Sequence, residues 1–339
     1  LERKNRSIFG EKLTELMEDR LQKREQIILF LNRRGYAGSV SCRKCGEVLK
    51  CPHCSVSLTA HMRYGRLDQL VCHYCGYQTP MPALCPNCQS KYIGTFGIGT
   101  QKVEQMVRER FPEAGVLRMD ADTTTGKEGH EKILQDFASG SADILIGTQM
   151  IVKGHDFPNV TLVGVLNADT SLNLPDYRSS ERTFQLLTQV AGRAGRAEKE
   201  GEVIIQSYNP NHYAIRFAKD QDYEGFFAYE MQIRRQLGYT PYYFTVGLTL
   251  SHKSEEIVME KSHQVMEILR SGLSDQVQIL GPTPKPIART HNLYHYQIIV
   301  KYRFEEGMTQ VLNQILEFTQ ERGNQDLRVS IDNEPQSFM

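Results

Sequence analysis

The sequence predicts an α/β protein in which a parallel-sheet lobe carries an inserted metal-binding module and is followed by a small α+β domain. Three observations predict this class. Short apolar segments alternate with amphipathic ones, all eight cysteines lie between Cys42 and Cys88, and the last third follows the order strand, helix, strand, strand, helix, strand. Alternation of this kind is typical of a doubly wound parallel sheet, with functional residues at the carboxyl ends of its strands.

These patterns divide the 339 residues into four parts. We expect residues 1–38 to hold a leader and the start of the lobe, 39–93 the cysteine-rich insertion, 94–211 the rest of the lobe, and 212–339 the α+β domain with a helical linker. Because the chain starts at Leu1 with a charged stretch, we expect it to be part of a longer protein.

The strands and helices of the lobe follow from hydrophobic periodicity. The expected strands are Gln26–Leu31, Tyr92–Gly97, Val116–Met119, Asp143–Ile146, Val160–Leu166 and Glu202–Gln206. The expected helices are Gln101–Arg110, Glu128–Ala138 and Ser179–Ala191. The continuous apolar runs among the strands are typical of central strands of a parallel sheet.

The cysteines form four C-x-x-C pairs, which begin at Cys42, Cys51, Cys72 and Cys85. A two-residue gap lets both thiolates of a pair bind one tetrahedral ion, and a disulfide framework would not need four identical spacings. The sequence therefore predicts two zinc ions with four cysteines each. Four protein ligands leave no position open for catalysis, so both sites are expected to be structural.

The eight cysteines can be paired in three ways, and spacing favours a nested arrangement. The inner site would be Cys51, Cys54, Cys72 and Cys75, and the outer site Cys42, Cys45, Cys85 and Cys88. Each ion then receives one C-x-x-C-G segment, whose glycine can take positive φ, and one C-P-x-C segment. Interleaved pairing would not mix the two types, and sequential pairing leaves only five residues between the first two segments.

Three nearby histidines, His53, His61 and His73, are further candidate ligands. Because the thiolates already complete both sites, we expect these side chains to face solvent or nucleic acid instead.

The first chemical motif runs from Ile144 to Pro158, directly after a predicted strand. Gly147 and Thr148 can offer backbone N–H groups and a hydroxyl to a phosphate. Gly154 would permit close approach of a ligand, and Asp156 could accept a hydrogen bond from a ribose hydroxyl. The plain alternative is an ordinary turn.

The second motif reads Gln-Val-Ala-Gly-Arg-Ala-Gly-Arg from Gln189 to Arg196. Gln189, Arg193 and Arg196 share one face if the helix continues that far. Two glycines at a helix end cost about 1 kcal/mol each relative to alanine, and close approach of an oxyanion is a physical reason to keep them. Two guanidiniums suit the γ-phosphate of a nucleotide. The plain alternative is a surface arginine pair.

The two motifs resemble motifs V and VI of the superfamily 2 helicases. The segment Asn32-Arg33-Arg34-Gly35-Tyr36, the four cysteine pairs after it and the Gly-Ile-Gly-Thr-Gln-Lys segment resemble the bacterial primosomal replication-restart helicases, the PriA (primosomal protein N′) family. This resemblance covers essentially the whole chain. It implies a RecA-like second helicase lobe, two zinc sites paired in the nested manner and a C-terminal domain.

The resemblance also implies roles for single residues. Arg193 and Arg196 would face ATP, with Gln189 coupling ATP to DNA, and Gly154 and Asp156 would lie at the nucleotide. Thr148 and Lys153 would contact the nucleic-acid backbone or support the ATP cleft, and Arg33 and Arg34 are further candidates for DNA contacts. Implied partners are branched and single-stranded DNA, the single-stranded-DNA-binding protein, and primosome and helicase-loading proteins. The implied setting is cytoplasmic and nucleoid-associated, without a membrane.

A phosphate-cradling loop is missing from the sequence, because no G-x-x-x-x-G-K-[ST] occurs and Gly126-Lys127-Glu128 fails at its last position. In the family this loop and the acidic magnesium site belong to the first lobe. We therefore expect ATP and Mg²⁺ to bind only when that lobe is present, and the chain alone to be inactive as a 3′–5′ helicase. The alternative reading is a non-enzymatic zinc-ribbon scaffold for DNA or protein.

The remainder is less informative. His212–Leu237 is expected to form two helices whose rings pack in the core, and Gly281–Arg289 a proline-rich loop beside His291 and Tyr294. Cations interleaved with rings could bind single-stranded DNA, or the loop could be merely solvated. Net charges of +3, +4, −4 and −3 over the four parts do not decide DNA binding, so any contact must come from local patches.

Overall fold

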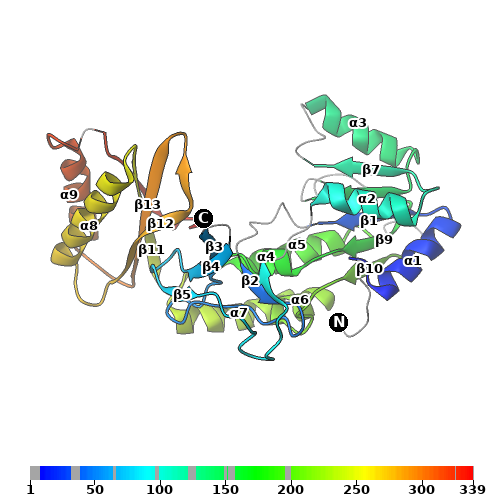
Figure 1. Cartoon of the computed structure of the whole chain (residues 1–339), viewed down its shortest axis with the longest axis horizontal. Helices are drawn as coiled ribbons and strands as arrows, with labels where there is room; N and C mark the ends of the chain where they lie inside the picture. The colour runs from blue at the N-terminus through cyan, green and yellow to red at the C-terminus, as the bar shows by residue number, and fades with distance from the viewer. Residues whose placement is uncertain are drawn as a thin grey trace.

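The computed structural model describes residues 8–31, 39–63, 66–95, 99–120, 127–148, 151, 157–194, 200–324 and 326–338. A parallel-sheet lobe and an antiparallel C-terminal domain lie at opposite ends of the molecule, and the cysteine-rich module lies between them (Figure 1). The predicted fold class is confirmed in all three regions.

The lobe is built on five parallel strands in the order β10-β9-β1-β8-β7. Their bounds are β1 Gln26–Phe30, β7 Val116–Met119, β8 Ile144–Gly147, β9 Val160–Val165 and β10 Glu202–Ile205. Every residue of β1, β8 and β9 is buried, as expected for strands covered on both faces. The corresponding predicted strands are confirmed to within a residue at each end.

Helices cover both faces of this sheet because successive side chains of a strand point to opposite faces. Ile27 and Leu29 pack with α1 (Glu11–Gln22) and α2 (Thr100–Arg110). Ile28 packs on the other face. That face is covered by α3 (Lys127–Ala138), α4 (Asp169–Leu172), α5 (Ser179–Ala191) and α6 (Tyr213–Lys219). Helix α1 was not predicted, since its charged residues hide an apolar stripe.

The module between the two halves of the lobe contains two small antiparallel sheets. One pairs β2 (Val40–Cys42) with β6 (Ile93–Thr95), and the other contains β3 (Thr59–Arg63), β4 (Arg66–Val71) and β5 (Gln78–Pro80). The prediction that the Tyr92–Gly97 strand begins the lobe's alternation is wrong. The strand pairs with the other end of the insertion instead, and so closes it.

The C-terminal domain has the predicted split βαβ order, with its sheet arranged β12-β13-β11-β14. Its elements are β11 Phe244–His252, α8 Glu255–Gly272, β12 Gln278–Thr290, β13 Leu293–Tyr302, α9 Met308–Gln320 and β14 Arg328–Asn333. The predicted proline-rich loop is wrong, because Gly281–Arg289 belongs to β12. Proline is tolerated there since β12 is an edge strand, and register shifts interrupt its pairing with β13.

Helix α7 (Tyr223–Leu237) links the lobe to this domain, and its rings were expected in the core. Only Phe226 is buried, and its ring stacks on Phe184 with centroids 4.1 Å apart. Tyr223, Phe227 and Tyr229 are exposed, so the prediction is wrong for these three. Tyr223 and Tyr229 still touch rings of the lobe helices, Phe184 and Tyr213, but at the surface.

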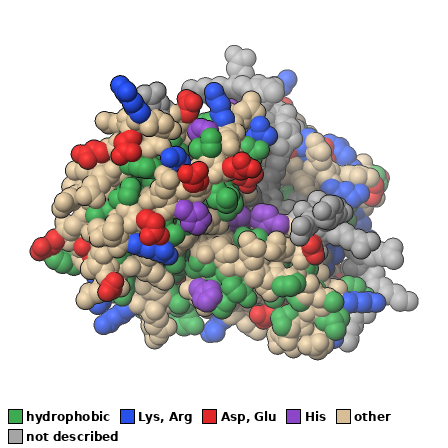
Figure 2. Space-filling model, turned by 60° about the vertical axis from the view of Figure 1, so that its left-hand side comes forward, with side chains coloured by type: hydrophobic (Ala, Val, Ile, Leu, Met, Phe, Trp, Pro, Cys, Tyr) green, Lys and Arg blue, Asp and Glu red, His purple; other side chains and the backbone are tan. Residues whose placement is uncertain are grey.

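Two surface properties bear on partners. Among the described residues, none of the helices combines the length and apolar composition that a membrane crossing requires. Acidic and basic side chains are interspersed on the face that Figure 2 presents, in agreement with the near-zero balance of charge.

Candidate metal centres and nucleotide-facing edge

The four C-x-x-C segments adopt the same backbone loop. In each, the first cysteine accepts a hydrogen bond at its carbonyl from the N–H four residues on and donates its own N–H to the carbonyl five residues on, all at 2.8–2.9 Å. The residue four positions on has positive φ in every case: Gly46, Ser55, Gly76 and Gln89. Positive φ at the two glycines was predicted, whereas nothing in the sequence marked Ser55 and Gln89.

The sulfur atoms gather into two groups of four, in the nested arrangement. Within each group all Sγ atoms lie within 4.8 Å of one another: Cys42, Cys45, Cys85 and Cys88 in one group, and Cys51, Cys54, Cys72 and Cys75 in the other. The Cys42–Cys88, Cys45–Cys85 and Cys51–Cys75 sulfurs are 3.6 Å apart. Four sulfurs at the usual distance from a tetrahedral zinc would be about 3.8 Å apart. The clusters therefore fit two structural zinc ions.

The electrostatics of each cluster favour one thiolate. The hydrogen bond from Cys54 lowers the pKa of Cys72 to about 5, although burial opposes this shift. Burial raises the pKa of Cys42, but N–H groups of its own loop outweigh that effect and bring the pKa to about 7. Because a thiolate is the form that binds metal, these backbone loops prepare ligands for a cation.

The histidines of the module lie beside the clusters without joining them, within the described residues. His73 Nδ1 lies 2.9 Å from the carbonyl oxygen of Pro284, and His73 Nε2 lies 3.1 Å from His61 Nε2. Burial lowers the pKa of His73 to about 4, so the ring is neutral at pH 7. The expectation that it faces solvent or nucleic acid is wrong, because its 3% exposed side chain lies against the C-terminal domain.

The module shares its core with the C-terminal part of the chain. Buried Tyr74, Leu58 and Leu70 pack in one cluster with Leu280, Ile299 and Phe338. The Tyr239 hydroxyl donates to the carbonyl oxygen of Cys54 at 2.9 Å, and the Gln297 amide donates to the carbonyl oxygen of His73. The second cysteine cluster is thus held by the domain as well as by its own loops.

The carboxyl ends of the parallel strands form one row at the edge of the lobe. Met119, Gly147, Phe30, Val165 and Ile205 are neighbours across the sheet in this register. Thr148 follows Gly147 and is buried. The first motif therefore begins at the edge where function was expected. Its other candidates, Lys153, Gly154 and Asp156, lie outside the described residues, as do Arg33 and Arg34.

The second motif lies where α5 ends. The helix stops at Ala191, and Arg193 and Ala194 continue with tighter hydrogen bonds to residues three positions earlier. Gln189 therefore belongs to α5, whereas Arg193 lies just beyond its end. Gln189 is exposed and Arg193 half-buried. Arg196 lies outside the described residues.

Sequence reasoning missed several buried carboxylates around this lobe. Asp120, which follows β7, accepts a hydrogen bond from Thr100 at 2.5 Å and pairs with Arg118. Asp176 accepts a hydrogen bond from Ser337 at 3.0 Å and pairs with Arg182 at 3.3 Å. Their places in the sequence, after a predicted strand for Asp120 and before a predicted helix for Asp176, could have marked them as candidates.

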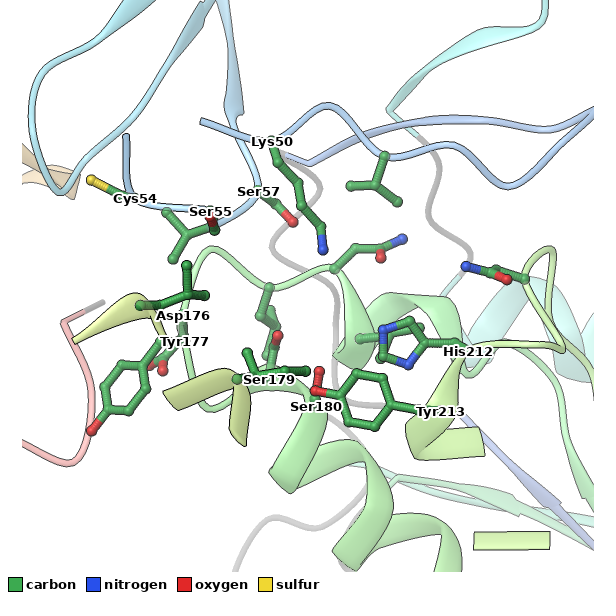
Figure 3. Close-up of a pocket in the computed structure, with 18 of the residues that line it drawn as sticks. Lys50, Cys54, Ser55, Ser57, Asp176, Tyr177, Ser179, Ser180, His212 and Tyr213 are labelled. Carbon is green, nitrogen blue, oxygen red and sulfur yellow. The ribbon is translucent and has the colours of Figure 1, made fainter. Parts of the chain in front are cut away.

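A pocket of about 600 Å³ opens where the module, the lobe and α7 meet. Figure 3 shows Lys50 and Ser57 of the module across it from Ser179, Ser180 and Tyr213. Of the motif candidates that the structure describes, Thr148, Gln189 and Arg193 do not line it.

Comparison with known proteins gives three family matches along the chain. The Helicase conserved C-terminal domain matches residues 89–198, the PriA DNA helicase Cys-rich region (CRR) domain residues 51–80, and the Primosomal protein N C-terminal domain residues 235–336. These matches fall on the lobe, the module and the antiparallel domain in turn.

Curated relatives match nearly the whole chain. Replication restart protein PriA of Bacillus subtilis (strain 168) is 49% identical over 336 residues, with 99% of this chain and 41% of the relative covered. The PriA of Synechocystis sp. is 46% identical, with 89% of this chain and 36% of the relative covered, and that of Haemophilus influenzae is 35% identical, with 99% and 46% covered. The chain thus spans less than half the length of these relatives. It belongs to the PriA family of replication restart proteins and corresponds to their C-terminal part.

Proposed function

We propose that this chain is the second lobe, zinc module and C-terminal domain of an ATP-driven 3′–5′ DNA helicase that restarts stalled replication. The observation that carries the proposal is the placement of Arg193 just after α5, in a lobe whose strand ends form one row. ATP and Mg²⁺ would bind between this edge and the first lobe of the longer protein, which would supply the phosphate loop.

The proposed division of roles follows the two motifs. Arg193 and Arg196 stabilise the charge that develops on the transferred phosphoryl group, and Gln189 couples this site to DNA. Gly154 and Asp156 lie at the nucleotide, whereas Thr148, Lys153, Arg33 and Arg34 contact the DNA backbone. The two zinc ions cross-link the loops of the module, and no step of the reaction passes through them.

The proposed substrates and partners belong to the longer protein. Branched and single-stranded DNA are the proposed ligands. The single-stranded-DNA-binding protein and the primosome and helicase-loading proteins are the proposed partners, in the cytoplasm at the nucleoid. The printed names of the curated relatives, replication restart proteins, support this setting.

The test uses the full-length protein with Arg193→Ala, and Arg216→Ala as the control because Arg216 is an exposed arginine of the neighbouring helix α6. Loss of an arginine that acts on the transition state lowers kcat by about 10³-fold or more. We expect Arg193→Ala to lose DNA-stimulated ATP hydrolysis and keep fork binding, and Arg216→Ala to keep both. Normal hydrolysis by Arg193→Ala would reject the motor and favour a zinc-ribbon scaffold.

A further inference from the structure

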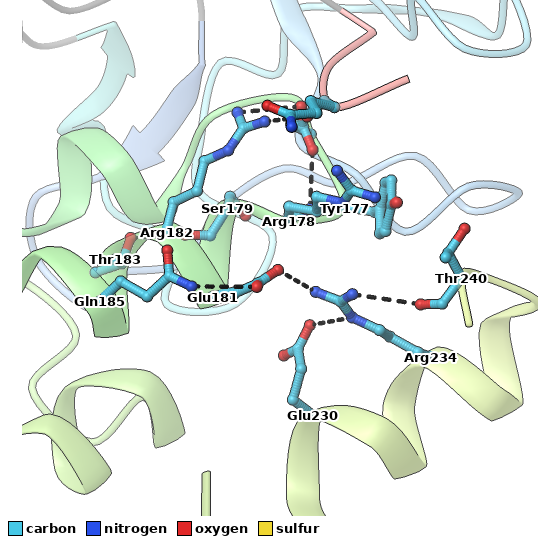
Figure 4. Close-up of polar contacts among 12 residues, drawn as sticks. Tyr177, Arg178, Ser179, Glu181, Arg182, Thr183, Gln185, Glu230, Arg234 and Thr240 are labelled. Atoms are coloured by element: carbon cyan, nitrogen blue, oxygen red, sulfur yellow. Dashed lines mark hydrogen bonds and ion pairs between the residues drawn. The ribbon is translucent and has the colours of Figure 1, made fainter. Parts of the chain in front are cut away.

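One buried guanidinium fixes the first turn of the helix that leads to Arg193. Arg234 of α7 places Nη2 2.7 Å from Glu181 Oε2 of α5 and Nε 2.8 Å from Glu230 Oε1 of its own helix. Its Nη1 donates to the carbonyl oxygen of Thr240 at 3.3 Å (Figure 4). Arg234 therefore joins α5, α7 and the segment that enters the C-terminal domain.

Because the Arg234 side chain and its partners are largely buried, lysine could not replace arginine at this position. The side chains of Arg234 and Glu230 are 8% and 3% exposed, and that of Glu181 is 33% exposed. A planar guanidinium reaches three acceptors in fixed directions, whereas a lysine ammonium cannot match this fork. Removal of one partner of a buried pair leaves an uncompensated charge, so loss of Arg234 would disturb its contacts with both α5 and α7.

Aromatic rings hold the same turn from the side. Tyr177, two residues before α5, stacks on Tyr239 with centroids 4.4 Å apart and planes 3° apart. The guanidinium carbon of Arg234 lies 5.3 Å from the centre of the Tyr177 ring. Stacking and cation–π contact restrict sideways movement of the chain as it enters the helix. Arg182, in the same turn, pairs with Asp176 and forms a second tie.

Helix geometry carries a change at this turn to the other end of α5. The helix has 13 residues and is therefore about 20 Å long. A tilt of about 3° at its first turn displaces its far end by about 1 Å. Misplacement of a catalytic group by about 1 Å costs on the order of 100-fold in rate.

We propose that Arg234 is a positioning residue for ATP hydrolysis, which acts through Glu181 to set the direction of α5 and hence the place of Arg193. This inference rests on the proposed function. Because Arg193 would act mainly on the transition state, while the first lobe binds most of the triphosphate, the effect falls on kcat rather than on KM.

The test measures DNA-stimulated ATP hydrolysis by the full-length protein with Arg234→Met, Arg234→Lys or Glu181→Gln. Arg235→Met is the matched control, because Arg235 is the next residue of α7 and is exposed. We expect Arg234→Met and Glu181→Gln to lower kcat about tenfold and to leave KM for ATP within about twofold of the parent. The expected loss of kcat is smaller than about 100-fold because the Arg182–Asp176 pair still holds the first turn of α5. Arg234→Lys should fall between, and Arg235→Met should match the parent.

Bound zinc and thermal midpoint are measured on each variant as readouts of folding. Should Arg234→Met fail to fold, Glu181→Gln provides the test. The Glu181 side chain is partly exposed, and glutamine is a neutral side chain of equal size, so this variant should fold. Parental kcat in Glu181→Gln, with Arg193→Ala inactive, would overturn the inference and leave the proposed function standing. Normal ATP hydrolysis by Arg193→Ala would overturn both the inference and the proposed function.

Discussion

The parallel-sheet lobe and the cysteine-rich module are stabilised in different ways. The lobe buries apolar side chains on both faces of its sheet, with Phe137 and Ile146 fully buried in separate clusters. The module's core instead includes the ligands Cys51, Cys54 and Cys72 and depends on residues of the C-terminal domain. A segment too small to bury its own core needs covalent or metal cross-links, and this segment has two sets of sulfurs for the purpose.

Metal removal should produce the largest difference in stability between the module and the lobe. Structural zinc contributes roughly 10–16 kcal/mol of apparent folding free energy in small domains. We expect a chelator to expose the amides of residues 39–95 to hydrogen exchange while the lobe strands stay protected. Equal loss of protection in both regions would show that they form one cooperative unit.

A core truncation in the lobe should give the opposite pattern. Phe137 is fully buried and packs edge-to-face on Phe157 with centroids 5.0 Å apart. Phe137→Ala should lower the free energy of unfolding of the lobe by about 3–5 kcal/mol, through lost burial and a cavity. Denaturant titration measures this loss, and the two bound zinc ions per chain should be unchanged. Release of zinc by this variant would contradict the separation.

Two equivalent glycines sharpen the comparison inside the module. Both Gly46 and Gly76 have positive φ, so alanine at either should cost about 1 kcal/mol. A Cβ on Gly46 would lie 2.5 Å from the carbonyl oxygen of Tyr208, whereas one on Gly76 meets only Thr283, at 4.0 Å. We expect Gly46→Ala to cost about 2 kcal/mol more than Gly76→Ala, as measured by zinc affinity and thermal midpoint. Equal losses in the two variants would mean that the backbone at Tyr208 moves away from the added methyl group at little cost.

Acid should lower stability through His212, which lies where the lobe meets Lys50 of the module. Burial, together with the charge of Lys50, lowers the pKa of His212 to about 4 in the folded state. The unfolded chain, whose histidine titrates near pH 6.5, then binds the proton first, so stability is complete above pH 6.5 and is lost as pH falls from 6.5 to 4.

His212→Asn keeps an acceptor at the start of α6, where the His212 ring accepts a hydrogen bond from the N–H of Ala214. We expect this variant to lose about 2 kcal/mol less than the parent between pH 7.5 and pH 5 in urea titrations. Acid also protonates the zinc ligands of both proteins, and the comparison of variant with parent removes that shared loss. Parallel curves for the two would contradict the assignment.

The sequence predicted local features better than the contacts between regions. Periodicity located β7 and α5, and identical cysteine spacing led to the nested sulfur groups. Periodicity could not show that Ile93–Thr95 pairs back on Val40–Cys42, because pairing partners are a tertiary property. It also could not show the Arg234–Glu181 pair, since the two residues lie 53 positions apart and each alone looks like a solvated charge.

The central claim, that this chain is one half of a two-lobed ATP-driven motor, is tested most directly by one measurement. Steady-state ATP hydrolysis is measured for the zinc-loaded 339-residue chain with saturating forked DNA, beside the full-length protein at equal concentration. The account predicts no DNA-stimulated hydrolysis by the chain and turnover by the full-length protein. Measurable DNA-stimulated turnover by the chain alone would contradict it.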